Sequence, residues 1–180
     1  MSESTRPRWA ESAAKERQGA NALCWLWLAV GVIVLDLGSK ALALGTLSFN
    51  APVPVIPGLF NLTLLFNFGA AFSFLAEHAG WQRWLFAGIA IVVVVAMSLW
   101  LYRIERRHWR LAAPVALVIG GALGNLFDRV VHGYVIDFLS FHWFDAYYYP
   151  AFNLADSAIV LGTLALVWDA FRSEKRSKKH

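Results

Sequence analysis

Four long apolar stretches constrain this chain more than any other feature of its sequence. They cover residues 23–44, 84–102, 111–127 and 151–171. A helix of about 20 apolar residues crosses the hydrocarbon core of a bilayer, because each residue adds about 1.5 Å along the helix axis. Hydrophobic residues make up 58% of the chain, whereas ordinary soluble domains contain about 45–50%. The sequence therefore predicts an all-α integral membrane protein with four transmembrane helices.

The segment between the first two spans has a different pattern. Prolines at positions 52, 54 and 57 break any helix, and residues 60–68 then read FNLTLLFNF. In this stretch Phe60, Leu62 and Leu64 would share one face, with Asn61 and Thr63 on the other. A period of two indicates a β-strand. We therefore expect a small extracytoplasmic β element that lies on the membrane surface beside the helices.

Basic residues are concentrated in three segments of the chain. The N-terminal arm at residues 1–22 holds 4, the loop after the second span 4 and the tail at residues 172–180 another 5, which together are 13 of the 16 Lys and Arg residues. In a four-span protein these three segments lie on one side of the membrane, and the positive-inside rule makes that side the cytoplasm. We expect a polar cytoplasmic arm, a membrane domain at residues 23–171 and a basic cytoplasmic tail.

Polar residues gather at the other, outer ends of the spans. Charged groups at membrane depth cost about 2.5–3.5 kcal/mol each on insertion scales, so they are usually paired or functional. Asp36 and Lys40 lie four residues apart on one helix face and could pair, or Lys40 could instead extend to the headgroups. The one-sided cluster indicates a site near the outer face. Its members are Asp36, Asn67, Asn125, Asp128, Arg129, Asp137, Asn153 and Asp156.

Two of these acids, Asp137 and Asp156, are each flanked by apolar residues. If the loop between them folds back, the carboxyl groups could share one proton, because two like charges in contact cannot both ionise. One carboxylate would then activate a water molecule, while its protonated partner polarises the scissile carbonyl and later protonates the leaving amine. This is the chemistry of an aspartic peptidase. In a purely structural alternative, Asp137 caps a short helix and Asp156 hydrogen-bonds within the bundle.

Other classes of function also fit a polar cluster in a membrane protein. An ion-coupled carrier would place its site near the midplane at broken helices within repeats, and neither feature is visible in the sequence. A non-enzymatic subunit could use the polar groups to join helices. A metallopeptidase is disfavoured because HExxH is missing. Ser39 and Lys40 cannot form a catalytic dyad, since adjacent helical residues point in different directions.

Five motifs occur in the order and spacing of one known family. They are DLGSK at residues 36–40, NFGAAF at 67–72, GGALGNLFDR at 120–129, VIDF at 135–138 and PAFNLADSAI at 150–159. Together with the four-span pattern, these motifs resemble those of the prolipoprotein signal peptidases, also called signal peptidase II. The resemblance extends over roughly residues 25–171.

The resemblance implies an aspartic endopeptidase of the bacterial inner membrane. Such an enzyme cleaves the signal peptide from diacylglyceryl-modified prolipoproteins, just before the lipidated cysteine. Asp137 and Asp156 match its catalytic pair, and Asp128 matches a structural position. Positions that bind substrate or line the site are matched by Asp36, Lys40, Asn67, Gly69, Asn125, Arg129 and Asn153. The implied partners are lipid-modified prolipoprotein and membrane lipids, with no metal, cofactor or nucleic acid, and we expect a monomer whose site faces the periplasm.

The charge distribution makes a prediction about membrane topology. A reporter that is active only outside the cytoplasm should be silent when fused at His180, because the basic tail stays inside. The same reporter inserted near Gly80, in the first outer loop, should be active. The measurement is reporter activity in whole cells at equal expression, and the reverse pattern would contradict the orientation.

Overall fold

The computed structural model describes residues 21–69, 81–144 and 146–177. The expectations for the N-terminal arm, for Ala70–Phe72 of the NFGAAF motif and for the last three residues of the basic tail lie outside the described residues. In chain order the elements are η1 (Ala22–Trp25), α2 (Leu26–Thr46), β1 (Val53–Ile56), β2 (Phe60–Asn67), α3 (Trp81–Arg103), α4 (Trp109–Val131), β3 (Val135–Trp143), β4 (Tyr147–Tyr148) and α5 (Leu154–Ser177).

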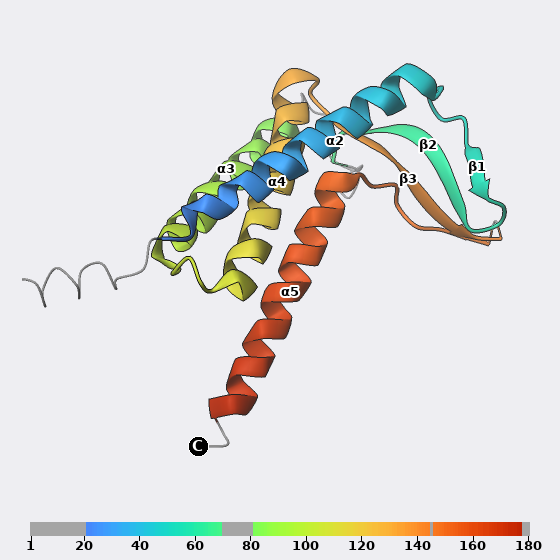
Figure 1. Cartoon of the computed structure of the whole chain (residues 1–180). Coiled ribbons are helices and arrows are strands. Elements are labelled where there is room, and N and C mark those ends of the chain that lie inside the picture. The colour runs from blue at the N-terminus through green and yellow to red at the C-terminus, as the bar shows by residue number, and fades with distance from the viewer. Residues whose placement is uncertain (1–20, 70–80, 145, 178–180) are drawn as a thin grey trace, which may run out of the picture.

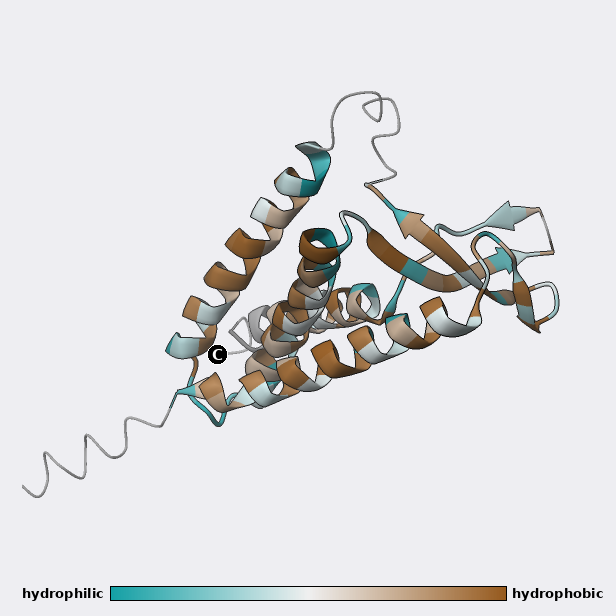
Figure 2. Ribbon diagram, turned by 90° about the horizontal axis from the view of Figure 1, so that it is seen from above, coloured by the Kyte–Doolittle hydropathy of each residue, from teal (hydrophilic) through white to brown (hydrophobic). Residues whose placement is uncertain are grey.

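Among the described residues, four helices are long and apolar enough to cross a membrane, as the sequence predicted. Their spans are Ala22–Thr46, Trp81–Arg103, Trp109–Val131 and Leu154–Arg172. Figure 1 shows the helices as a bundle with the sheet at one end, beside the end of α2 and the start of α5. Apolar residues run along the lengths of the helices, and hydrophilic ones lie mainly near helix ends and in connections (Figure 2). The chain therefore has the architecture of a multi-pass membrane protein with a small sheet.

The predicted start of the fourth span at residue 151 is wrong. The helix begins at Leu154, and Pro150 lies outside it. Asn153 precedes the first helical residue, and its side-chain Oδ1 accepts a hydrogen bond from Asp156 N at 2.9 Å. Asn is a strong N-cap residue, so this bond, and not the proline, defines where the helix starts. The third span also differs, because α4 continues to Val131 and keeps Asp128 and Arg129 in its last turns.

Helix α4 is the centre of the bundle. Two-thirds of its spanning window is buried (67%), against 17% in each of the other three spans. Its glycines allow this close packing, because a Cβ at Gly120 would lie 2.8 Å from the carbonyl oxygen of Ala29 in α2. A Cβ at Gly121 would likewise collide with the carbonyl oxygen of Ala155 in α5. The small residues of the third span thus bring α2 and α5 against one helix, as small residues do in lipid.

The sheet is antiparallel and has the strand order β1-β2-β3-β4. The predicted strand at residues 60–68 is confirmed as β2, although a register shift between Leu62 and Leu65 interrupts its alternation. Strand β3 pairs with β2 and places Asp137 opposite Leu65. The alternative in which Asp137 caps a short helix is therefore wrong. The reason is the apolar and aromatic sequence of β3, which suits a strand and finds a long-range partner in β2.

Close packing at Gly121 predicts different effects for two Gly-to-Ala substitutions. Gly121→Ala should lower the free energy of unfolding by about 1–3 kcal/mol, because the new methyl group forces α4 and α5 apart. Gly31→Ala in α2 is the matched control, since its Cβ would meet no atom within 4 Å, and it should be neutral or stabilise by up to about 1 kcal/mol. The measurement is unfolding in detergent. Equal effects of the two substitutions would show that the α4–α5 contact is not tight.

Candidate active site

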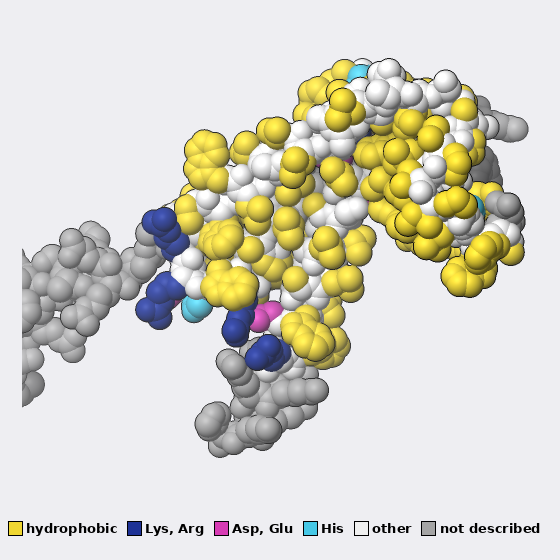
Figure 3. Space-filling model, turned by 45° about the vertical axis from the view of Figure 1, so that its right-hand side comes forward, with side chains coloured by type: hydrophobic (Ala, Val, Ile, Leu, Met, Phe, Trp, Pro, Cys, Tyr) yellow, Lys and Arg dark blue, Asp and Glu magenta, His cyan; other side chains and the backbone are white. Residues whose placement is uncertain are grey.

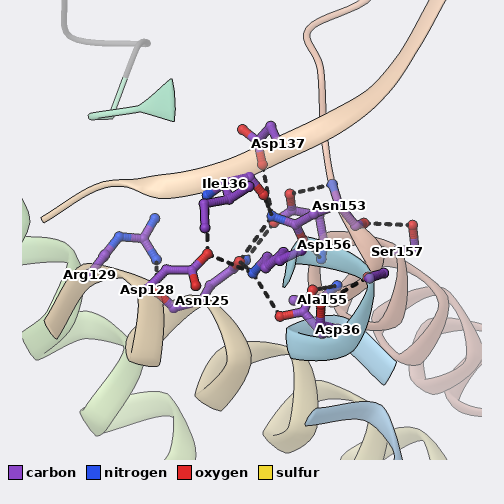
Figure 4. A network of polar contacts seen from close by, with 12 residues as sticks. Asp36, Asn125, Asp128, Arg129, Ile136, Asp137, Asn153, Ala155, Asp156 and Ser157 are labelled. Carbon is purple, nitrogen blue, oxygen red and sulfur yellow. Dashed lines mark hydrogen bonds and ion pairs between the residues drawn. The ribbon is translucent and has the colours of Figure 1, made fainter. Parts of the chain in front are cut away.

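A buried lysine lies at the centre of the polar cluster. Lys40 Nζ is 2.7 Å from Asp36 Oδ2 and 2.8 Å from Asp128 Oδ2, and it also donates to Asn125 Oδ1 at 3.1 Å. Lys40 is only 2% exposed. The predicted pair of Asp36 and Lys40 is thus confirmed, and the alternative in which Lys40 extends to the headgroups is wrong. This ion pair cluster, formed by Asp36, Lys40 and Asp128, joins α2 to α4 (Figure 4).

The two acids of the ion pair cluster also hold backbone groups of other elements. Asp36 Oδ1 accepts a hydrogen bond from Ala155 N at 2.9 Å, in the first turn of α5. Amide groups in a first helical turn lack partners within the helix, so an acidic side chain is favourable there. Asp128 Oδ2 accepts from Ile136 N in β3 at 3.1 Å. The ion pair cluster therefore connects α2, α4, α5 and β3. The two backbone groups that it holds, Ala155 N and Ile136 N, belong to the residues directly before Asp156 and Asp137.

Asn153 connects the two candidate catalytic acids. Its Nδ2 lies 2.7 Å from Asp137 Oδ1, 3.1 Å from Asn125 Oδ1 and 3.3 Å from the carbonyl oxygen of Ile136. Asp156 and Asn153 bind each other reciprocally, because Asp156 Oδ2 accepts from Asn153 N at 3.3 Å while Asn153 Oδ1 accepts from Asp156 N. Such an exchange is a capping box. Fully buried Asn153 thus contacts both acids, Asp137 through its side-chain amide and Asp156 through the capping box (Figure 4).

Each of the two acids has a further asparagine partner. Asn67 Nδ2 in β2 donates to Asp137 Oδ2 at 2.9 Å, and Asn125 Nδ2 in α4 donates to Asp156 Oδ1 at 2.7 Å. Asp137 is buried and Asp156 is half-buried. The two acids are thus held by neutral amide donors from α4, β2 and the residue before α5. Each of the four carboxyl oxygens accepts a hydrogen bond from one of these N–H donors.

The environment of Asp137 favours its protonated form. Burial raises the pKa of Asp137 to about 7, against a lowering effect of the hydrogen bond from Asn67. The nearby charge of Asp156 raises the pKa further, while the bond from Asn153 lowers it. Desolvation and a like charge both disfavour a second anion. Asp137 therefore carries a proton at pH values below about 7.

Arg129 and Gly69 lie at the border of the site, against a residue that sequence reasoning missed. Phe86 in α3 lies 5.3 Å from the guanidinium of Arg129. Its ring also abuts Gly69, where an added Cβ would approach to 2.7 Å. Gly69 has a φ of 101°, and its N–H donates to Asn67 Oδ1 at 2.9 Å. Phe86 therefore supports the turn that orients Asn67, but an aromatic residue in an apolar span carries no sequence signal for such a role.

The residues predicted for the site lie together in one network. Its hydrogen bonds and ion pairs include Asp36, Lys40, Asn67, Gly69, Asn125, Asp128, Arg129, Asp137, Asn153 and Asp156. Arg129 joins it through Nη1, which donates to the carbonyl oxygen of Asn125 at 3.2 Å. Sequence reasoning did not foresee the backbone N–H groups of Ile136 and Ala155. Within the described ranges, no group of three His, Cys, Asp or Glu side chains could hold a metal ion.

The contacts of Asp128 predict a structural phenotype. Asp128→Asn keeps an oxygen that can accept from Ile136 N but removes a charge that faces Lys40, so it should destabilise the fold by about 1–3 kcal/mol. The yield of folded protein should fall more than the peptidase activity per folded molecule. Both quantities can be measured on detergent-purified protein. A variant that folds normally but is inert would place Asp128 in the chemistry.

Comparisons with known proteins identify the family. The family model described as Signal peptidase (SPase) II matches residues 28–172. The chain is 56% identical over 153 residues to the lipoprotein signal peptidase of Pseudomonas aeruginosa (strain PAO1), covering 85% of this chain and 90% of that one. It is 52% identical over 157 residues to that of Ectopseudomonas mendocina, covering 87% and 93%. These likenesses exclude the carrier and the non-enzymatic subunit.

Two solved structures share the fold, and each is described as a bacterial membrane enzyme. Their TM-scores are 0.73 and 0.75, at 28% and 27% sequence identity. They cover 82% and 87% of this chain and 92% and 93% of their own chains. The chain therefore belongs to the signal peptidase II family and is an aspartic peptidase that cleaves signal peptides from prolipoproteins in lipoprotein maturation.

Proposed function

We propose that Asp137 and Asp156 are the catalytic pair of this peptidase. The observation that carries the assignment is the position of buried Asn153, whose side-chain Nδ2 donates to the Asp137 carboxyl group and whose backbone N–H donates to the Asp156 carboxyl group. An aspartic mechanism needs two carboxyl groups held close together with one proton between them. Asn67 donates to the second carboxyl oxygen of Asp137, and Asn125 donates to the second carboxyl oxygen of Asp156.

The environments of the two acids support different roles. Asp156, the more exposed acid, acts as the general base and takes a proton from water as the water oxygen attacks the scissile carbonyl carbon. Asp137, whose pKa is raised to about 7 by burial, donates a hydrogen bond to the carbonyl oxygen as it becomes an oxyanion. The tetrahedral intermediate collapses when the leaving nitrogen receives the Asp137 proton. The proton that Asp156 took from water then restores the pair.

The remaining polar residues divide into two groups in this proposal. Asn67, Gly69, Asn125, Arg129 and Asn153 line the site and orient the pair or the substrate backbone. Asp36 and Lys40 are 0% and 2% exposed, so they do not touch substrate. Their role is to hold the residues next to the catalytic pair in place. Asp128 has the structural role. We propose that the active form is a monomer.

Exposed aromatic side chains on the sheet support a lipid-modified substrate. Phe68, Trp143 and Phe144 are 66%, 63% and 70% exposed. Phe68 follows β2 at the end of the sheet next to the helices, and Trp143 and Phe144 lie at the opposite end of β3. Such rings favour the headgroup layer. We infer that the substrate is a diacylglyceryl-modified prolipoprotein that enters along the bilayer, is cut just before its lipidated cysteine, and leaves the acyl chains in the membrane.

The proposed orientation follows the basic segments. The polar arm at residues 1–22 and the basic tail at residues 172–180 lie in the cytoplasm, and the membrane domain at residues 23–171 presents the catalytic pair near the periplasmic face of the inner membrane. The support is the 13-of-16 split of Lys and Arg.

Substitution of either catalytic acid tests the pair. Asp137→Asn and Asp156→Asn nearly preserve shape but remove the titrating group, so each should abolish cleavage of a diacylglyceryl-modified lipobox peptide while folded yield stays normal. The double variant should be hardly worse than either single variant, because members of a catalytic unit are not additive. Glu105→Gln, outside the site, is the control. Turnover by folded Asp137→Asn would refute the assignment.

Lipid dependence tests the substrate proposal separately. Each buried methylene of an acyl chain contributes about 0.8 kcal/mol, so the diacylglyceryl group should dominate binding. The same peptide without the lipid should be cleaved poorly, mainly through a higher KM. Equal kcat/KM for the two peptides would contradict entry along the bilayer and leave the catalytic pair unaffected.

A further inference from the structure

A second concave site lies at the end of the bundle opposite the catalytic pair. A cavity of about 340 Å³ opens between the first turns of α4 and the last turns of α5, and its lining includes Trp109, Arg110, Trp168, Asp169 and Arg172. A neighbouring hollow of about 360 Å³ shares Trp109, Arg110 and Asp169 and adds Arg107. We call these two together the Arg–Trp cavity. It lies roughly 24 Å along α4 from Asn125, at 1.5 Å per residue.

The charges of the Arg–Trp cavity favour an anion. Arg107, Arg110 and Arg172 are exposed, and the half-buried Asp169 is the acidic residue in the lining. The lining therefore has a net charge of +2, from three arginines and one aspartate. Among the described residues, none of the three arginines has an ion pair partner. Figure 3 shows basic side chains at this end of the helices with an acidic patch among them.

The walls of the Arg–Trp cavity are apolar and aromatic. Trp109 and Trp168 are 57% and 70% exposed, and the guanidinium of Arg110 lies 5.6 Å from the ring of Trp109. Tryptophan is typical of the boundary between headgroups and acyl chains. Non-specific attraction of a basic protein surface to anionic lipids requires only positive charge spread over that surface. Here the arginines border a hollow with apolar walls, which fits a molecule with both a phosphate and hydrocarbon.

We propose that the Arg–Trp cavity binds one anionic phospholipid of the leaflet at the basic end of the bundle. Arg110 and Arg172 bind the phosphate, a group whose geometry the planar guanidinium matches. Asp169 accepts hydrogen bonds from headgroup hydroxyls, and Trp109 and Trp168 pack against the glycerol and the upper acyl chain. The net charge of +2 selects an anionic headgroup over a zwitterionic one. The proposal is independent of the catalytic assignment.

The test is lipid binding by the full chain in a non-ionic detergent, followed by native mass spectrometry. Phosphatidylglycerol is titrated in one series and phosphatidylcholine with the same acyl chains in another. The wild type should bind phosphatidylglycerol at least about tenfold more tightly. The double variant Arg110→Gln/Arg172→Gln should lose on the order of 30-fold in affinity for phosphatidylglycerol, with its affinity for phosphatidylcholine little changed.

The matched control removes the same charge at the same end of the bundle. Arg103→Gln/Arg106→Gln lies outside the lining of the cavity and should keep its phosphatidylglycerol affinity within about threefold, since the charge effect beyond direct contact is screened. An equal loss in the control, or equal binding of the two lipids by the wild type, would overturn the proposal.

A third variant tests the cavity independently, in case the arginine double variant does not fold. Trp168→Leu keeps all charges but removes the aromatic wall, and it should weaken phosphatidylglycerol binding by about tenfold. All variants should retain lipid-free melting temperatures and peptidase turnover, because the catalytic pair lies at the other end. Unchanged binding by folded Trp168→Leu would contradict a shaped cavity.

Discussion

The site depends on one buried ammonium group held between two carboxylates. Lys40 pairs with Asp36 and Asp128, and all three side chains are at most 2% exposed. Ions removed from water are tolerated only when the remaining charge and hydrogen-bonding capacity are satisfied. The backbone N–H groups of Ala155 and Ile136 complete that requirement for the two acids. Removing Lys40 would leave the two buried carboxylates without a counter-ion, at a typical cost of about 3–5 kcal/mol.

This arrangement explains how two distant acids meet. The residues that the ion pair cluster holds, Ile136 and Ala155, directly precede Asp137 and Asp156. The two carboxylates whose salt bridges attach α2 to α4 therefore also hold the backbone next to both proposed catalytic positions. Asn153 then completes the alignment as a neutral group that bonds to both acids. The charged residues hold the backbone in position, whereas the side-chain amides bond to the carboxyl groups of Asp137 and Asp156. Different residues therefore perform these two functions.

Much of the fold could be predicted because its signals are local. Apolar run length identified the four spans, and the spacing of Asp36 and Lys40 identified their pair. The partners missed from the sequence depend on long-range geometry. Strand β3 is defined by pairing with β2 across about 70 residues of chain, as the Asn67–Asp137 hydrogen bond illustrates. A pairing between segments so far apart in the sequence is not visible in the local sequence of either one. The start of α5 was misplaced because Pro150 was favoured over the capping box of Asn153 and Asp156. Phe86 was missed because its role is contact with Gly69 and Arg129.

A proton-sharing pair requires that Asp137 be protonated at neutral and mildly acidic pH, and the protonation state of Asp137 can be measured. Its pKa is raised from the usual 3.8 to about 7 in the folded protein. The stability that this carboxyl group contributes is therefore complete at low pH and is lost as the pH rises towards 7. Infrared difference spectra of the wild type and Asp137→Asn across this range isolate the carboxyl stretch of that residue. If the pair shares a proton, the wild type should show a protonated carboxyl band that disappears with a midpoint near pH 7, and Asp137→Asn should lack this band. An Asp137 that is already ionised throughout the neutral and mildly acidic range would contradict it.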